Sequence, residues 1–442
     1  MSVFLCALIT RCVLVAVSGL FESFALDDST YHQITSDMAS GDISHWDDYT
    51  YSLFWSTATF SVPVTGLYEL FGSDLWIGQL YVALLGALTA VVVTAIALEF
   101  LDRRWAIASG VAVALLPSQV FWSSQLMKDA SVWLALAVLS LLIAVAGRAS
   151  GRRLAACWAG IALCLVGLAF LREHTLVVAA WAVVVAAFAG LPAFRIARVI
   201  PAVLLAVAIP WLVAGVGPGG WSLVTNAGAL PLLRYQMAQD ANTAIVDTTP
   251  RGTEAELDVL VTEQREISEE IATLEAALQQ ASPRTGSDRK TLAQQRKRLE
   301  ALREEHAALL AEQQEIQSPP AITEEGSLDP SIKHLPRGLS VMLLEPLPLP
   351  FSGSTPLRLA RLESLLWYPL LILAGIGLWR AKAHLRVLLF PLVAGAGILL
   401  LYALSEGNIG TAHRHRGELV WVVALLAGYG ASRIFRGQAR AT

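Results

Sequence analysis

The sequence predicts an all-α membrane protein: a helical bundle that crosses a bilayer about ten times, plus an antiparallel coiled-coil hairpin on its outer side. Three observations predict this class. Hydrophobic residues make up 55% of the 442 positions, charged residues only 15%, and the mean hydropathy is +0.56. The apolar residues fall in runs of about 20, the length that a helix needs to cross the hydrocarbon layer. The loops after alternate runs are basic.

The apolar runs are counted as spans, with one exception. The first is expected to stay uncleaved, because no clear small-residue cleavage site precedes Asp27. Arg11 interrupts this run, so its side chain should either snorkel to the inner surface or face the bundle. The run at 53–71 contains Pro63 and Gly66, which favour an interfacial or re-entrant helix. The ten spans cover residues 3–20, 75–98, 105–122, 130–146, 154–171, 175–191, 199–216, 362–379, 387–404 and 419–434.

The distribution of basic residues orients these spans. The loops after the second, fourth, sixth and eighth spans, and the tail after the tenth, carry arginine or lysine and almost no acid. Cytoplasmic loops carry this excess, so both termini are predicted to be cytoplasmic. The outer side then holds the acidic first loop at 22–74, the turns at Lys128 and Arg172, the long polar insert and the loop at 406–416.

Composition divides the chain into five parts. The N-terminal transmembrane part (1–216) and the C-terminal transmembrane part (358–442) flank an outer loop (217–252), a hairpin insert (253–317) and a return linker with an interfacial segment (318–357). In the insert, apolar residues recur three and four positions apart, as in the seam of a coiled coil. A breaker at 282–288 divides it into two arms. The hairpin could be an inert spacer, a self-association arm or a docking site for a protein partner.

Net charge and cysteine content say little about function. The net charge of −4 is small and argues neither for nor against nucleic acid, and no nucleic-acid partner is expected. The four cysteines all lie inside apolar runs, so the sequence predicts no disulfide framework.

Asp27 and Asp28 follow the first span, with Tyr31 and His32 close by on any helix that begins there. Ionisable residues at a membrane boundary are functional candidates, although a solvated helix end is the simpler explanation. One carboxylate could accept the proton of an incoming hydroxyl. The other could orient that hydroxyl, or the pair could hold a divalent cation, Mg²⁺ or Mn²⁺, through oxygen ligands.

Cationic side chains gather on the same predicted side, next to helix ends. They could bind a phosphate or diphosphate leaving group and stabilise its charge. The run from His413 to Arg416 lies where the orientation rule predicts few arginines. That position favours an anionic partner, although an anchor on lipid phosphates or a weak zinc site would also use these residues. The candidate substrate-binding residues are Tyr31, His32, Lys128, Arg172, His174, His413, Arg414 and Arg416.

The stretch Asp-Asp-Ser-Thr-Tyr-His at 27–32, followed by Met-Ala-Ser-Gly at 38–41, resembles the first outer loop of GT-C membrane glycosyltransferases. In this respect the chain is similar to protein O-mannosyltransferases and to the lipid A aminoarabinose transferase. Residues 80–92, the stretch 117–129 ending in Lys-Asp, Arg172 and the stretch 410–416 resemble further family features. The likeness covers residues 1–175 and, more loosely, 333–442. The hairpin insert is not a general family feature.

The resemblance implies an inverting enzyme of the bacterial plasma membrane. It would move a sugar from a polyprenyl-phosphate donor to a glycan, lipid or protein acceptor on the outer face. Asp27 or Asp28 would be the base or a metal ligand, and the donor phosphate would be clamped by Lys128, Arg172, Arg414 and Arg416. Two other classes stay open: a non-enzymatic scaffold that presents the hairpin to a partner, and a flippase or transporter of lipid-linked glycans.

Overall fold

The computed structural model describes residues 2–18, 26–189, 196–213, 230–239, 245, 254–280, 286–317, 329–349 and 355–438. The regular elements among these residues are all helices. The chain forms two compact units, one made of residues 1–233 with 326–442 and the other of residues 234–325. Helix α13 (Leu230–Gln239) contains the boundary between them.

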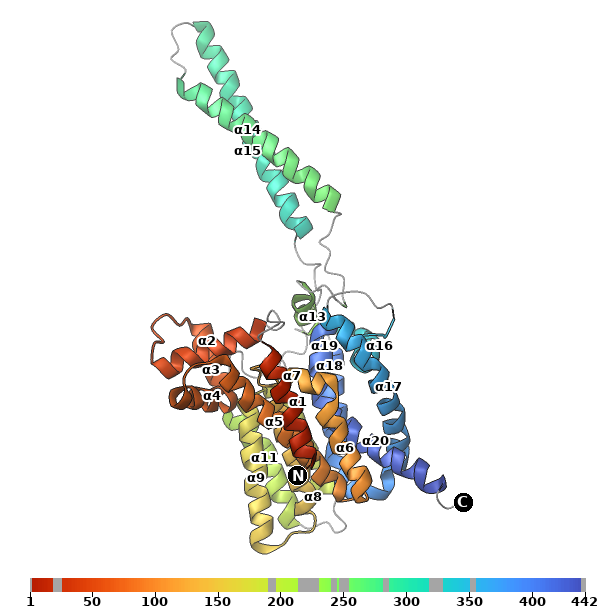
Figure 1. The fold of residues 1–442 in the computed structure, drawn as a ribbon. Coiled ribbons are helices and arrows are strands. Elements are labelled where there is room, and N and C mark those ends of the chain that lie inside the picture. The colour runs from red at the N-terminus through yellow and green to blue at the C-terminus, as the bar shows by residue number, and fades with distance from the viewer. Residues whose placement is uncertain are drawn as a thin grey trace. The chain divides into compact units, whose positions relative to one another are not determined.

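The first unit is a bundle of apolar helices (Figure 1). Among the described residues, five stretches are long and apolar enough to cross a bilayer, which confirms the predicted polytopic all-α membrane fold. They are α5 (Leu75–Leu98), α8 (Asp129–Ala146), α9 (Gly151–Ala169), the stretch of α17 (Thr355–Arg380), η2 (Ala381–His384) and α18 (Leu385–Ser405), and α20 (Gly417–Gln438). Helices α1 (Ser2–Ser18), α10 (Glu173–Ala189) and α11 (Ile196–Val213) are shorter and apolar. The count of ten spans stays a prediction.

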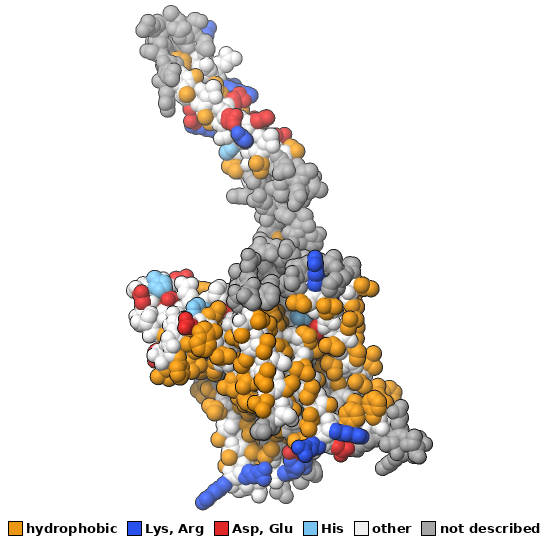
Figure 2. Space-filling view, viewed as in Figure 1, with side chains coloured by type: hydrophobic (Ala, Val, Ile, Leu, Met, Phe, Trp, Pro, Cys, Tyr) orange, Lys and Arg blue, Asp and Glu red, His pale blue; other side chains and the backbone are white. Residues whose placement is uncertain are grey.

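Figure 2 shows a broad hydrophobic area on one face of this unit, with lysines and arginines gathered at one end of that face. Turns between consecutive long helices meet at an end of the bundle. Arg148, after α8, pairs with Glu99, after α5, and Phe100 packs against His384 with ring centroids 5.6 Å apart. Helix α1 begins and α20 ends at this same end (Figure 1). The predicted topology and its sidedness in the membrane stay predictions.

The span predicted at 105–122 is not one helix. It is divided into α6 (Arg103–Leu115) and α7 (Pro117–Trp122). Pro117 has no amide N–H and its ring clashes with the preceding turn, so the first helix must end before it. Residues 123–128 then lead into α8. We call residues Pro117–Asp129 the connecting segment.

Three short helices lie together at the other end of the bundle, α2 (Leu26–Ser40), α3 (Asp48–Ser56) and α4 (Ala58–Phe71) (Figure 1). Asp47 caps α3 by accepting a hydrogen bond of 2.7 Å from the Thr50 amide. With 14 residues, α4 is about 21 Å long at the usual rise per residue and is too short to cross the hydrocarbon layer. The helix predicted at 53–71 is thus divided between α3 and α4, and its interfacial or re-entrant placement stays a prediction.

Close backbone contact fixes the C-terminal helices. Helix α16 (Asp329–Leu344) packs on α18, with Gly338 directly against the Ala403 carbonyl. Helices α17 and α20 approach each other in the same way, because a Cβ atom on Gly377 or Gly430 would clash with a backbone carbonyl of the other helix. Small residues allow this approach, which is a common basis of helix packing in membranes. Helix α19 (Ile409–His415) lies between α18 and α20 in the chain.

The second unit contains α14 (Glu254–Gln280) and α15 (Gly286–Gln317), which lie side by side (Figure 1). Two ion pairs join them, Arg298 with Glu270 at 3.3 Å and Arg303 with Glu275 at 2.7 Å. Leu302 is 1% exposed between them. These helices coincide with the predicted arms of the hairpin. The coiled-coil geometry and the role of the hairpin stay predictions.

Candidate functional site

The connecting segment joins helices that are far apart in the sequence. Ser118 bonds to Glu363 of α17, and Gln119 donates to the Gly417 carbonyl at the start of α20. Further along, the Leu126 amide bonds to Asp28 of α2, and Asp129 pairs with two arginines. Candidate residues from both ends of the chain are therefore held by one short stretch.

Asp28 is 3% exposed and bonds to two neutral donors. Its Oδ1 accepts a hydrogen bond from the Leu126 amide at 2.6 Å, and its Oδ2 accepts one from Gln79 Nε2 at 3.3 Å. Burial raises the pKa of Asp28 above its ordinary value, while the two hydrogen bonds and the nearby His32 act in the opposite direction. A carboxylate with this raised proton affinity is suited to accept a proton.

Asp27 belongs to the first turn of α2, but its side chain lies outside the described residues. Among the described residues, no group of three His, Cys, Asp or Glu side chains is placed to hold a metal ion. The predicted Mg²⁺ or Mn²⁺ site on Asp27 and Asp28 therefore stays a prediction.

Tyr31 and His32 pack against α4. Tyr31 is buried edge-on against Phe60, with ring centroids 5.2 Å apart. His32 Nδ1 lies 2.9 Å from the Tyr68 hydroxyl. Burial and the neighbouring Asp28 carboxylate raise the pKa of Tyr68, so this hydroxyl stays protonated at neutral pH. The pair therefore places a hydrogen-bonded imidazole and phenol hydroxyl beside Asp28.

Arg172 is the centre of a buried charge network. Its Nη2 lies 2.9 Å from Asp129 Oδ1, and its Nη1 bonds to both the Glu418 carboxylate and the Tyr402 hydroxyl. Thr175 Oγ1 donates to Glu418 at 3.1 Å. Burial alone would lower the pKa of Arg172, but Tyr402 and the two carboxylates raise it well above its ordinary value. Arg172 is thus permanently charged and fully surrounded by protein partners.

Arg414 shares Asp129 with Arg172. Its Nε and Nη2 lie 3.0 Å and 2.9 Å from Asp129 Oδ2, and its guanidinium lies 5.9 Å from the centre of the Trp122 ring. The Arg414 side chain is 16% exposed, compared with 5% for Arg172. Arg414 is therefore the more accessible of the two arginines on Asp129.

His413 and Arg416 form a second cluster around Glu363. His413 Nε2 and Arg416 Nη2 lie 3.6 Å and 3.9 Å from Glu363 Oε1, beyond hydrogen-bond distance. Both nitrogens are buried and have no hydrogen-bond partner within the described part of the chain. Burial lowers the pKa of Arg416 to about 10 and also lowers that of His413. Both nitrogens thus lie near the Glu363 carboxylate without a hydrogen bond to it.

The remaining candidates lie around Tyr402 and Asp129. His174 Nε2 lies 3.2 Å from the Tyr402 hydroxyl. His415 stacks on the Tyr402 ring at 4.3 Å and pairs with Glu406. Lys128 directly precedes Asp129 at the N-cap of α8 and is half-buried.

The structure brings the predicted cations together but adds acids that the sequence argument left out. Arg172, His174 and Arg414 gather on Asp129, Glu418 and Tyr402, while His413 and Arg416 gather on Glu363. A signal was available for two of these acids, because Glu363 and Glu418 lie within or next to apolar runs, where an acid is unusual. The catalytic and binding roles of all the candidates stay predictions.

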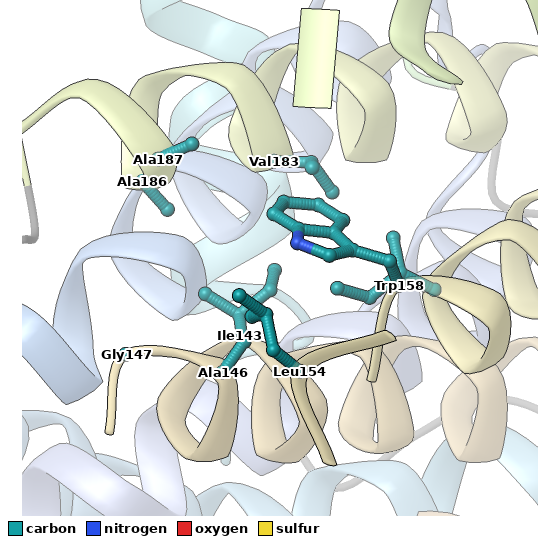
Figure 3. A pocket seen from close by; sticks show the side chains of 9 residues that line it. Ile143, Ala146, Gly147, Leu154, Trp158, Val183, Ala186 and Ala187 are labelled. Atoms are coloured by element: carbon teal, nitrogen blue, oxygen red, sulfur yellow. The ribbon is translucent and has the colours of Figure 1, made fainter. Parts of the chain in front are cut away.

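The apolar pocket in Figure 3 lies elsewhere, between α8, α9 and α10. Its lining includes Ile143, Leu154, Trp158 and Val183, and it lies towards the C-terminal end of α8, whereas Asp129 begins that helix. This lining contains no charged side chain that could pair with a phosphate.

No protein-family model matches the chain, and no curated protein sequence matches it. Among solved structures, the chain is similar to the crystal structure of ArnT from Cupriavidus metallidurans bound to undecaprenyl phosphate. The alignment has 17% sequence identity, covers 98% of this chain and 77% of that chain, and has a TM-score of 0.35. A TM-score of this size does not establish a shared fold, so the functional argument rests on the residues of this chain.

Proposed function

We propose that this protein is a membrane glycosyltransferase that moves a sugar from a polyprenyl-phosphate donor to an acceptor hydroxyl at the outer face of a bacterial plasma membrane. One observation carries the proposal. The Leu126 amide holds Asp28, and Asp129, three residues further on, holds Arg172 and Arg414. The connecting segment thus holds both the carboxylate proposed to accept the proton and a cluster of cationic side chains.

Asp28 is the proposed base. The acceptor oxygen attacks the anomeric carbon of the sugar while its proton passes to the Asp28 carboxylate. The bond between that carbon and the phosphate oxygen breaks, and polyprenyl phosphate leaves with the electron pair. Attack opposite the leaving group inverts the configuration. Asp27 is the second candidate for this role.

Cations near the leaving group would stabilise its charge. His413 and Arg416 each keep a buried nitrogen that makes no hydrogen bond among the described residues, and Arg414 is partly exposed. Arg172 is engaged by Asp129, Glu418 and Tyr402. These contacts support a division in which Arg172 positions the network, while Lys128, His413, Arg414 and Arg416 face the phosphate.

Both oxygens of Asp28 accept hydrogen bonds from N–H donors, so the proposal assigns Asp28 to proton transfer. If a divalent cation takes part, its positive charge would stabilise the phosphate, and Asp27 would have to be one of its ligands. Chelation followed by Mg²⁺ or Mn²⁺ addition in the transfer assay tests this second prediction.

The test uses the purified full chain in nanodiscs with a panel of polyprenyl-phosphate sugars and acceptor glycans, lipids and peptides. Mass spectrometry measures released polyprenyl phosphate and glycosylated acceptor. Asp28→Asn should lower the rate at least about 100-fold, as expected for loss of a general base. Asp42→Asn is the matched control, because Asp42 is exposed and the side-chain contacts described for it are local, a hydrogen bond from Ser44 and an approach of 4.0 Å to His45. Full activity of both Asp27→Asn and Asp28→Asn would contradict the proposal.

A further inference from the structure

We infer that Arg11 is a positioning residue that replaces missing backbone donors at the break between α6 and α7 and thereby fixes the connecting segment that holds Asp28 and Asp129. The link to Asp28 as a base rests on the proposed function. The link from Arg11 to the connecting segment rests on contacts alone.

Arg11 is 0% exposed in the middle of α1. Its guanidinium donates to the carbonyls of Ala7 and Ala114 at 2.9 Å and 3.0 Å and to Ser123 Oγ at 2.6 Å. Longer contacts reach Val113 O at 3.4 Å and Gln119 O at 3.5 Å. All of these acceptors are neutral. A buried arginine in a membrane helix that binds backbone carbonyls in this way faces the bundle and does not snorkel.

The two α6 carbonyls have lost their ordinary partners. In an unbroken helix, Val113 O would accept from the amide of residue 117, and Ala114 O from that of residue 118. Pro117 has no amide hydrogen, and the Ser118 amide donates to Glu363 instead. Unsatisfied carbonyls within a membrane are costly. The Arg11 guanidinium donates to both of them.

The same guanidinium also binds Ser123, which follows α7 on the other side of the break. Ser123 Oγ accepts from Arg11 Nε and donates to the Gln119 carbonyl, while Ser124 Oγ donates to the Arg11 carbonyl at 3.4 Å. Gly86 of α5 leaves room for this arrangement. A Cβ atom on Gly86 would lie 2.6 Å from both Arg11 Nε and Ser123 Oγ. Residues of two helices, Arg11 of α1 and Gly86 of α5, therefore fit the break between α6 and α7.

The residue that Arg11 holds, Ser123, lies three residues before Leu126 of the candidate site. Ser123 is followed by Leu126, whose amide binds Asp28, and then by Asp129. If Arg11 no longer bridges Val113, Ala114 and Ser123, the segment loses its fixed position. The Leu126 amide then no longer opposes the effect of burial on Asp28.

Hydrogen exchange measured by mass spectrometry on the full chain in nanodiscs tests this inference without any substrate. Arg11→Gln removes the charged guanidinium group, and Gly86→Ala displaces that group without changing a polar side chain. Both variants should speed amide exchange in residues 118–128 about tenfold, the effect of losing one or two hydrogen bonds to a charged group. Gly375→Ala is the matched control, because a Cβ atom on Gly375 meets nothing within 4 Å.

Faster exchange confined to residues 118–128 in both variants, or in Gly86→Ala alone if Arg11→Gln does not fold, supports the inference. Unchanged exchange, or an equal rise in every helix, overturns it. The pH profile of transfer is the second measurement. Displacement of the Leu126 amide should move the acid limb to higher pH in Gly86→Ala but not in Gly375→Ala. If the wild-type protein transfers no sugar, the proposed function fails, while the exchange result still decides the role of Arg11.

Discussion

Asp129 and Arg414 are separated by 285 residues in the chain, yet Arg414 Nε donates to Asp129 Oδ2 at 3.0 Å. The other oxygen of the same carboxylate accepts from Arg172 Nη2 at 2.9 Å. Asp129 is fully buried. A single carboxylate therefore pairs with two arginines from different parts of the chain and holds them at the start of α8.

Asp129→Asn should destabilise the bundle by about 3–5 kcal/mol, because it removes one of the two carboxylates paired with buried Arg172 and the carboxylate that Arg414 contacts through Nε and Nη2. Unfolding of purified protein in mixed micelles, followed by circular dichroism as SDS is added, measures this loss. Arg148→Gln is the control, because it removes an ion pair in which Arg148 is 50% exposed. An exposed pair contributes about 0–1 kcal/mol. Equal stability of the two variants would show that the Asp129 network does not hold the bundle together.

Gly377→Ala and Gly430→Ala should each destabilise the contact between α17 and α20. In both cases the added methyl group would meet a backbone carbonyl, Leu426 O or Leu373 O, which cannot rotate away. Overpacking of this kind costs about 1–3 kcal/mol. Gly375→Ala, two residues from Gly377, adds the same methyl group in open space and should leave stability nearly unchanged. The same unfolding assay compares the three variants, and equal curves would contradict this packing.

Local physics made much of the fold predictable from the sequence. Apolar runs identified α5, α8 and α9. Apolar residues three and four positions apart in the polar insert placed the hairpin arms near the observed bounds of α14 and α15. The span expected at 105–122 failed for a local reason that was visible, because Pro117 lies in its interior. The α6 break became interpretable only when Arg11 was found beside it, more than 100 residues away.

The candidate site was only partly predictable, because charges can be read from a sequence but pairings cannot. Arg172 and Arg414 stood out as outer-side cations. The sequence did not reveal that Asp129 binds both of them, and a paired arginine has a different role from one that faces a phosphate. Asp28 was visible for its position after the first span. Its burial depends on Gln79 and Leu126, which carry no sequence signal of their own.

Deletion of the hairpin separates the enzyme hypothesis from the scaffold hypothesis. Residues 254–317 belong to a compact unit of their own, so replacing them with a short Gly/Ser linker should leave the bundle folded. The proposed enzyme should keep its transfer activity, measured as released polyprenyl phosphate. Light scattering on the same samples tests self-association, since a dimerisation arm would be lost together with its dimer. A scaffold would show the opposite pattern: function lost with the hairpin and kept in Asp28→Asn.

The raised pKa of Asp28 predicts opposite pH effects on activity and stability with one shared midpoint. As a base, Asp28 must be deprotonated, so transfer should fall as pH drops through its pKa in the folded protein. For stability the sign reverses. Burial is the main cause that raises this pKa above 3.8, so the folded state binds more protons than the unfolded state between the two values. The stability contributed by protonated Asp28 is fully present below the unfolded pKa and is lost as pH rises through the folded one.

Asp28→Asn mimics the protonated form and should therefore match the wild-type protein in stability at low pH but exceed it at neutral pH. The difference between the two unfolding curves, measured from pH 4 to pH 8, reports the midpoint for the folded protein. The acid limb of the transfer rate should have that same midpoint, because a single carboxylate governs both. Coincident midpoints would tie the buried carboxylate to the chemistry, whereas an acid limb unrelated to the stability midpoint would assign the base to another residue, with Asp27 next in line.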